Sequence, residues 1–165
     1  WNLADRGSWA EFTRRFTDAG IDETRLQLCE PIAGIAEHLA AYNRVDVALD
    51  TFPYHGTTTT CEALWMGVPV VTLAGDRHAS RVGASLLHAA GLPDLVAKDE
   101  EAYVHIATSL AGDATRRAHL RATLRDDLRA GPLCDETSYC RRLENALRGL
   151  WSEWCQTQTI ARPHA

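Results

Sequence analysis

Four consecutive threonines, Thr57 to Thr60, form the most chemically informative run in the sequence. They follow an apolar stretch that ends at Asp50 and a loop that contains Gly56, and this pattern predicts that a helix begins among them. The first N–H groups of a helix have no partner within it, and the helix dipole places about half a positive charge at that end. Free amides, hydroxyl donors and a positive pole together favour an anion, and a diphosphate fits that description.

Glu62 stands about one turn into the same predicted helix. A carboxylate there can accept hydrogen bonds from the two vicinal hydroxyls of a ribose, as acidic residues do in dinucleotide-binding folds. A purely structural interpretation accounts for the same residues, because threonine is a good N-cap, a threonine run can be solvated, and the dipole alone favours acids near a helix N-terminus. Spacing alone leaves both interpretations open.

A second polar segment, from Ala74 to Arg81, also lies between a predicted strand and a predicted helix. In a parallel sheet this segment opens onto the same edge as the threonine run. Arg77, His78 and Arg81 can therefore contribute positive charge to a phosphate or to an acceptor. Alternatively, Asp76 caps the helix and the arginine side chains are solvated. The sequence leaves the roles of His78 and Arg81 open.

Strand and helix patterns alternate over the first two thirds of the chain. Predicted strands cover residues 25–29, 45–50, 68–73 and 95–97, and predicted helices cover 8–19, 35–42, 57–66, 79–90, 101–110, 114–129 and 136–154. This alternation predicts an α/β fold with a doubly wound parallel sheet, followed by C-terminal helices.

A helix, not a strand, comes first in this pattern, and doubly wound sheets normally have more than four strands. We therefore expect an incomplete sheet in an N-terminally truncated lobe over residues 1–156, with a frayed tail over 157–165.

Composition excludes several classes of function. The net charge is −5 and the arginines are scattered, so no basic face for nucleic acid is expected. No apolar run approaches the roughly 18 residues that span a bilayer, so no membrane role is expected either. The five cysteines include no CxxC pair, which argues against a disulfide framework or a zinc site and favours reduced thiols in the cytoplasm.

The run LDTFPYHGTTTTCEALWMGVPVVTLAGDRHASRVGASLL strongly resembles the C-terminal catalytic lobe of the family that contains O-linked N-acetylglucosamine transferase and SPINDLY. The resemblance extends from about Trp9 to Trp154. It implies the Rossmann-like C-terminal lobe of a two-lobed, B-type glycosyltransferase. Such enzymes are usually preceded by tetratricopeptide repeats and glycosylate Ser or Thr hydroxyls of intracellular proteins. The implied partners are a nucleotide-sugar donor, a protein acceptor, and an N-terminal lobe and repeats outside this chain, in the cytoplasm.

The resemblance also implies roles for particular residues. Thr58 and Thr59 match the helix-start threonines that hold the donor diphosphate, and Glu62 matches the acidic residue on the ribose. Thr57 stands beside them, where the animal N-acetylglucosamine enzymes have a His. Candidate accessory residues of the same site are His55, Gly56 and His78.

Contacts to the nucleotide base are implied for two residues of the predicted helix 35–42 and the segment before it. A lone His on a helix is more often a surface or core residue than a ligand, but His38 matches a His close to the base. Ala33 falls where a backbone contact to the base is expected. Ile35 and Ala41 replace a Lys and an Arg that lie near the nucleotide in the animal enzyme, so the base is not fixed by the resemblance.

These implications together predict a nucleotide-sugar-dependent protein O-glycosyltransferase similar to O-GlcNAc transferase, with UDP-GlcNAc or GDP-fucose as the donor substrate and no metal or other cofactor. The alternatives are a GDP-fucose-using, SPINDLY-like O-fucosyltransferase, and a non-catalytic nucleotide-binding module or remnant. No catalytic residue is assigned in this chain. The family's essential Lys on the diphosphate and the His residues of its N-terminal lobe would lie upstream of Trp1, so we expect the isolated chain to transfer no sugar.

Overall fold

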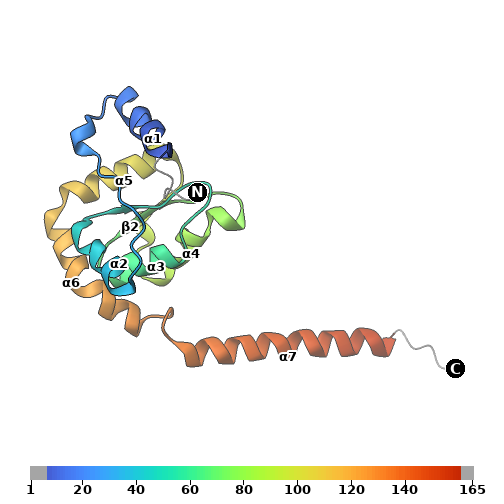
Figure 1. Cartoon of the computed structure of the whole chain (residues 1–165). Helices are drawn as coiled ribbons and strands as arrows, with labels where there is room; N and C mark the ends of the chain where they lie inside the picture. Colours follow the sequence, from blue (N-terminus) through green and yellow to red (C-terminus); the bar gives the residue numbers. More distant parts are fainter. Residues whose placement is uncertain (1–6, 161–165) are drawn as a thin grey trace. The chain divides into compact units, whose positions relative to one another are not determined.

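The computed structural model describes residues 7–160, with side chains to residue 157 (Figure 1). Contacts within the chain divide it into two compact units, residues 1–41 and residues 42–165. Each unit is described by itself. The single lobe predicted for residues 1–156 stays a prediction.

In the described part of the first unit, residues 7–41, the regular elements are all short helices. They are α1 (Gly7–Asp18), the 3-10 helix η1 (Glu23–Arg25) and α2 (Ile35–Ala41). The strand predicted for residues 25–29 is wrong, because Arg25 ends η1 and residues 26–33 have no regular structure. An isolated strand leaves its N–H and C=O groups unpaired, and within the described part of this unit no second strand is present to pair with them. Side-chain alternation alone therefore does not form a strand here.

The second unit is built on a three-stranded parallel sheet, which confirms the α/β fold. The strands β1 (Ala48–Leu49), β2 (Val70–Leu73) and β3 (Val96–Ala97) lie in the order β1-β2-β3. Ala48 pairs with Val70, and Thr72 pairs with Val96. The strand predicted over 45–50 is shorter than expected, because only its last part pairs with β2.

The crossovers of the sheet carry the helices of the candidate site. The 3-10 helix η2 (Tyr42–Arg44) precedes β1, and helix α3 (Thr58–Trp65) connects β1 to β2. Helix α4 (Val82–Ala89) connects β2 to β3, with the 3-10 helices η3 (His78–Ser80) before it and η4 (Pro93–Leu95) after it. Because strand order follows chain order, right-handed crossovers place α3 and α4 on one side of β2 (Figure 1). The loop before α3 and the segment before α4 therefore emerge at the same edge of the sheet.

Three helices follow the sheet, as predicted. They are α5 (Glu100–Gly112), α6 (Ala114–Ala130) and α7 (Glu136–Ile160). The side chains of Asp99 and Asp113 cap the first two helices by accepting a hydrogen bond from a first-turn N–H. Helix α7 continues to Ile160, so residues 157–160 of the predicted tail are helical, and residues 161–165 lie outside the described part. Across residues 7–160, no helix combines the length and apolar character needed to cross a membrane.

Strand β2 runs through the hydrophobic core, and all four of its residues are buried. Side chains from α3, α4 and the C-terminal helices pack around it: Ala63, Leu64, Leu87, Leu110, Leu120, Leu124 and Leu128. Since each fully buried Leu or Val side chain contributes roughly 1.5–3 kcal/mol, this cluster fixes the crossover helices on the sheet.

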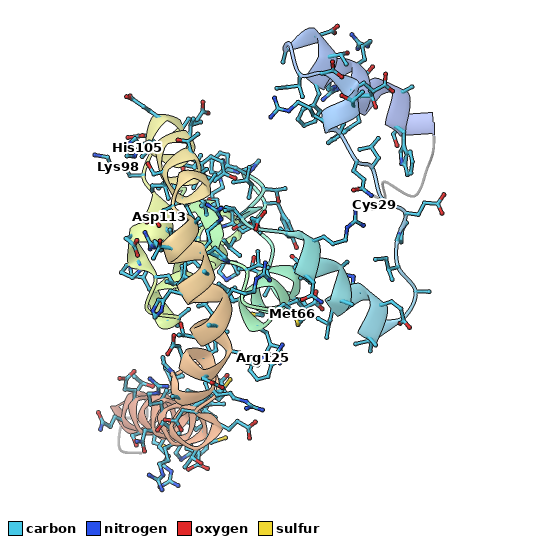
Figure 2. All side chains as sticks on the ribbon, turned by 90° about the vertical axis from the view of Figure 1, so that its left-hand side faces the viewer. Cys29, Met66, Lys98, His105, Asp113 and Arg125 are labelled. Carbon is cyan, nitrogen blue, oxygen red and sulfur yellow. The ribbon has the colours of Figure 1, made fainter. Side chains whose placement is uncertain are left out.

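Two arginines of α6 hold the C-terminal end of α3. Arg121 donates to the backbone carbonyl of Met66 at 2.9 Å and also to that of Val45, and Arg125 Nε donates to the carbonyl of Trp65 at 2.9 Å. Figure 2 shows Arg125 beside Met66, and Nη2 of Arg125 lies 3.2 Å from the Met66 sulfur. The last carbonyls of a helix have no partner within it and form its negative pole. Helix α3 is therefore anchored at one end by two cations.

Candidate functional site

The N-terminal end of α3 presents three of the four threonines to solvent. Thr57 is the N-cap and its side chain makes no capping bond, while Thr58 and Thr59 open the helix, and all three are exposed. Across the described residues, the hydroxyls of these three threonines have no hydrogen-bond partner. Thr60 differs, because it is buried and its hydroxyl donates to the carbonyl of Gly56 at 3.1 Å. The run thus divides into one structural threonine and three that are available to a ligand.

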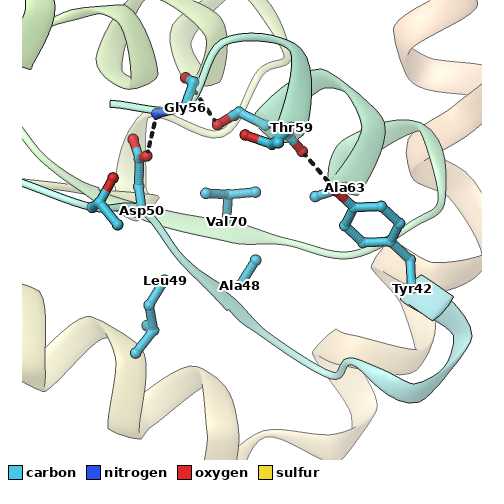
Figure 3. A pocket seen from close by; sticks show the side chains of 10 residues that line it. Tyr42, Ala48, Leu49, Asp50, Gly56, Thr59, Ala63 and Val70 are labelled. Atoms are coloured by element: carbon cyan, nitrogen blue, oxygen red, sulfur yellow. Dashed lines mark hydrogen bonds between the residues drawn. The ribbon is translucent and has the colours of Figure 1, made fainter. Parts of the chain in front are cut away.

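A buried carboxylate holds the loop that leads into this helix. Asp50 follows β1, and its side chain is 3% exposed. Its Oδ1 accepts from the backbone N–H of Gly56 at 2.8 Å (Figure 3). Its Oδ2 accepts from the Thr72 hydroxyl at 2.7 Å. A buried carboxylate is tolerated only when it is hydrogen-bonded, so these bonds fix Gly56, directly before the threonines, to the two strands.

His55 belongs to the same loop, and its side chain is fully buried. Its Nε2 lies 2.9 Å from the carbonyl of Leu73, and the N–H of Gly83 donates to its Nδ1 at 3.0 Å. A carbonyl can only accept and a backbone N–H can only donate, so the proton is on Nε2 and the ring is neutral. The 3.4 Å approach of Nδ1 to Asp50 Oδ2 is therefore not an ion pair. His55 supports the loop, and both its ring nitrogens are engaged within the protein.

Glu62 lies one turn into α3, half-buried, beside Tyr42 of η2. The phenol O–H of Tyr42 donates to Glu62 Oε2 at 3.4 Å and lies 3.3 Å from the carbonyl of Thr59 (Figure 3). Burial raises the pKa of Tyr42, and the neighbouring Glu62 carboxylate raises this pKa further. The phenol therefore stays protonated at neutral pH and keeps donating.

A cavity of about 160 Å³, here called the Tyr42 cavity, lies beside this pair. It is lined by residues of η2, β1, the loop and α3, among them Tyr42, Asp50, Gly56, Thr59 and Thr60. Figure 3 shows Tyr42 directed across it toward Thr59. Asp50 and the last two threonines of the run thus line one hollow at the sheet edge, and Glu62 contacts the Tyr42 phenol beside it.

The second polar segment forms another hollow at the other side of the threonine run. A cavity of about 500 Å³, here called the Arg81 cavity, is lined by Thr57, His78, Arg81, Val82, Ser85 and Leu86. The N-caps of η3 and α4 are Arg77 and Arg81, so Asp76 caps neither helix. The capping alternative for Asp76 is therefore wrong, and the structure brings His78 and Arg81 together with Thr57.

The sequence of residues 7–143 matches the family described as Glycosyl transferase family 41. The chain belongs to this family.

Several known proteins are similar to this chain in sequence. A protein of Arabidopsis thaliana, described as a probable UDP-N-acetylglucosamine–peptide N-acetylglucosaminyltransferase SPINDLY, is 45% identical over 145 residues, which are 88% of this chain and 16% of that protein. A UDP-N-acetylglucosamine–peptide N-acetylglucosaminyltransferase of Caenorhabditis elegans is 36% identical over 155 residues, which are 93% of this chain and 13% of that protein. The chain therefore spans less than a fifth of the length of these relatives.

A solved structure of a mutant O-GlcNAc transferase from Thermobaculum terrenum has the same fold. Its sequence is 44% identical, and the two structures superpose with a TM-score of 0.86. The superposed region is 93% of this chain and 29% of the chain of that enzyme. The predicted resemblance to the catalytic lobe of O-GlcNAc transferase and SPINDLY is thereby confirmed, as is the incomplete parallel sheet.

The two residues with predicted base contacts lie in the first unit of this family 41 chain. His38 is half-buried on α2, where its backbone N–H donates to the carbonyl of Gly34 at 2.8 Å. Ala33 is exposed and precedes α2. Their contacts to a nucleotide base stay predictions. The absence of a metal also stays a prediction, although within residues 7–160 no three His, Cys, Asp or Glu side chains are grouped to hold one.

Sequence reasoning missed the residues that support the threonine run. Asp50, Thr72 and Gly83 were not singled out, although Asp50 and Thr72 are polar residues at the carboxyl ends of apolar strands, and that position is itself a signal. Tyr42 is the last residue of the predicted helix 35–42, and no sequence signal connects it with Glu62. No sequence signal identifies Gly83, because its role depends on how closely α4 approaches β2.

Gly83 offers a test of the buried network. A Cβ at this position would lie 2.3 Å from Asp50 Oδ2 and 2.4 Å from Thr72 Oγ1. We predict that Gly83→Ala lowers the free energy of unfolding by about 1–3 kcal/mol, the usual cost of overpacking a buried site. The measurement is urea unfolding followed by circular dichroism.

Gly149→Ala in α7 is the matched control, because a Cβ there meets nothing within 4 Å. It should leave stability unchanged or raise it by about 0.5–1 kcal/mol through helix propensity. Equal effects of the two substitutions would contradict the close packing of α4 on Asp50.

Proposed function

We propose that this chain supplies the donor-binding part of a nucleotide-sugar-dependent protein O-glycosyltransferase. The observation that carries the proposal is the exposed, unpartnered hydroxyls of Thr57, Thr58 and Thr59 at the start of α3, in a member of family 41. The relatives' names support UDP-N-acetylglucosamine as the donor and a peptide as the acceptor. A cytoplasmic location and preceding tetratricopeptide repeats stay predictions.

The ligand of the threonine run is, in this proposal, the diphosphate of the donor. The first helical bond of α3 runs from the N–H of Cys61 to the carbonyl of Thr57 at 3.1 Å, so the amides of residues 58–60 have no helical partner. Amides and hydroxyls at the positive end of a helix dipole favour an anion. The backbone there is held by Asp50 through Gly56, so the donors are ordered before a ligand arrives.

Glu62 is proposed to bind the ribose of the same nucleotide. The helix pitch of about 5.4 Å places it one turn from the threonines, which suits a ribose attached to a bound diphosphate. Its carboxylate accepts a hydrogen bond from the phenol of Tyr42, and Tyr42 lines the Tyr42 cavity. Tyr42 thereby acts on the ribose through Glu62.

The proposed reaction is an inverting transfer of the sugar. The bond between the anomeric carbon and the phosphate oxygen breaks, and its electron pair stays on that oxygen. An acceptor hydroxyl oxygen forms the new bond to the anomeric carbon, and its proton passes to a base outside this chain. Negative charge grows on the departing diphosphate, so fixed donors at α3 stabilise the transition state more than the ground state.

The diphosphate assignment is tested by replacing Thr58 and Thr59 with valine in the protein that carries this chain. We predict that the affinity for UDP and GDP falls by about tenfold or more, because a hydrogen bond to a charged group contributes roughly 1.5–3 kcal/mol. The fold should persist, since both side chains are exposed. Titration calorimetry measures the affinity, and Thr108→Val on the exposed face of α5 is the matched control. Unchanged affinity for both nucleotides would refute the assignment.

The ribose assignment makes a separate prediction about Glu62. The Glu62→Ala substitution should weaken the binding of UDP and GDP several-fold, and it should weaken pyrophosphate much less, because pyrophosphate has no ribose. The comparison of the three ligands by calorimetry isolates the contribution of the hydroxyls. If all three affinities fall equally, Glu62 acts only as an acid near the helix N-terminus.

A further inference from the structure

Arg81 is a fixed cation without a carboxylate partner. Its Nη1 donates to the carbonyl of Gly75 at 2.9 Å, which holds the guanidinium at the edge of the segment before α4. No ion pair within 4.0 Å involves Arg81 among the described residues, whereas Arg14 has two and Arg15 and Arg116 each have one. The four N–H groups of the guanidinium that Gly75 does not engage remain available, and their charge is not neutralised by the protein.

The cavity beside Arg81 is chemically suited to an anion. Its lining includes two hydroxyl residues, Thr57 and Ser85, and also His78. No acidic residue lines this cavity of about 500 Å³, and its apolar part is limited to Val82 and Leu86. An arginine fork binds phosphate oxygens in a bidentate manner, which makes phosphate a better match than a neutral ligand.

The two cavities give the proposed donor a direction along α3. Thr59 lines the Tyr42 cavity and Glu62 contacts the Tyr42 phenol, so the ribose is proposed to bind at this cavity. Thr57 lines the Arg81 cavity instead. A diphosphate that lies across Thr58 and Thr59 therefore has its nucleoside end toward Glu62 and its sugar end toward Arg81.

We infer that Arg81, with Thr57 in the same cavity, binds the phosphate that carries the sugar. This inference rests on the proposed function and adds a residue that the sequence left open. The sugar-bearing phosphate gains negative charge when the glycosidic bond breaks. A guanidinium already held by Gly75 meets that charge without reorganisation.

The test compares nucleotides with one and two phosphates. In the protein that carries this chain, Arg81→Gln should weaken UDP and GDP about tenfold or more, which is the scale of a lost charge-assisted contact, and should change the affinity for UMP and GMP by less than about threefold. Arg81→Lys should restore part of the loss, because it returns the charge without the planar fork. The affinity of Arg81→Gln for the diphosphates should also fall less steeply with added salt.

Arg77→Gln is the matched control, because it removes the same charge from the same segment at a side chain outside the cavity. Equal losses of diphosphate affinity for Arg77→Gln and Arg81→Gln would overturn the inference. They would indicate a non-specific effect of positive charge in this segment and not a direct contact of Arg81 with the phosphate. Equal losses for mono- and diphosphates would also overturn it.

Failure of the inference and failure of the proposed function give different results. Normal diphosphate binding by Arg81→Gln, together with weakened binding by the Thr58 and Thr59 variant, overturns the role of Arg81 and leaves the proposed function standing. An unsubstituted protein that binds neither UDP nor GDP overturns both.

Discussion

The buried carboxylate of Asp50 is the constraint on which the rest of the site depends. A charge of this kind is costly to bury, and the cost is offset only when its oxygens are hydrogen-bonded. Here one oxygen takes the N–H of Gly56 and the other takes the hydroxyl of Thr72. These bonds tie the end of β1 to β2 and to the loop that starts α3. The tyrosine Tyr103 adds a third tie, because its phenol donates to the Asp50 carbonyl at 2.9 Å.

This network explains why the threonine run can be ordered although the hydroxyls of Thr57, Thr58 and Thr59 make no hydrogen bond within the described part of the chain. Thr60 and His55 are buried, and the polar atoms of their side chains form hydrogen bonds within the protein. Because the hydrogen bonds of Asp50 and His55 already hold the loop, the hydroxyls of Thr57, Thr58 and Thr59 are not needed for its stability and remain available. A site that is preorganised in this way avoids the cost of ordering donors when a charged ligand arrives.

Much of the fold follows from the sequence, because helices and buried strands leave a local periodicity. The helices after residue 100, the buried strand β2 and the start of α3 among the threonines all appear where the pattern indicates. The strand predicted for residues 25–29 is wrong because a strand depends on a partner, which a local pattern does not report.

The same limit applies to the site. Their position at a predicted helix start makes Thr57 to Thr59 candidates for an anion, but the burial of His55 and the partners of Arg81 depend on contacts between distant segments. Gly83 lies 28 residues after His55 in the chain and still donates to its ring. Such close approaches of backbone to side chain are set by tertiary packing, so neither residue type nor spacing reveals them.

The arginines of α6 connect the C-terminal helices to α3, whose opposite end carries the threonine run. Arg121 and Arg125 satisfy the last carbonyls of that helix and place positive charge at its negative pole. Their charge does not reach the threonines directly, because dipole effects fall off within a turn. They act instead by holding the helix in position against the sheet, so that its N-terminal amides stay aimed at the sheet edge. The helices that follow the α/β unit are therefore part of the framework that orients the site.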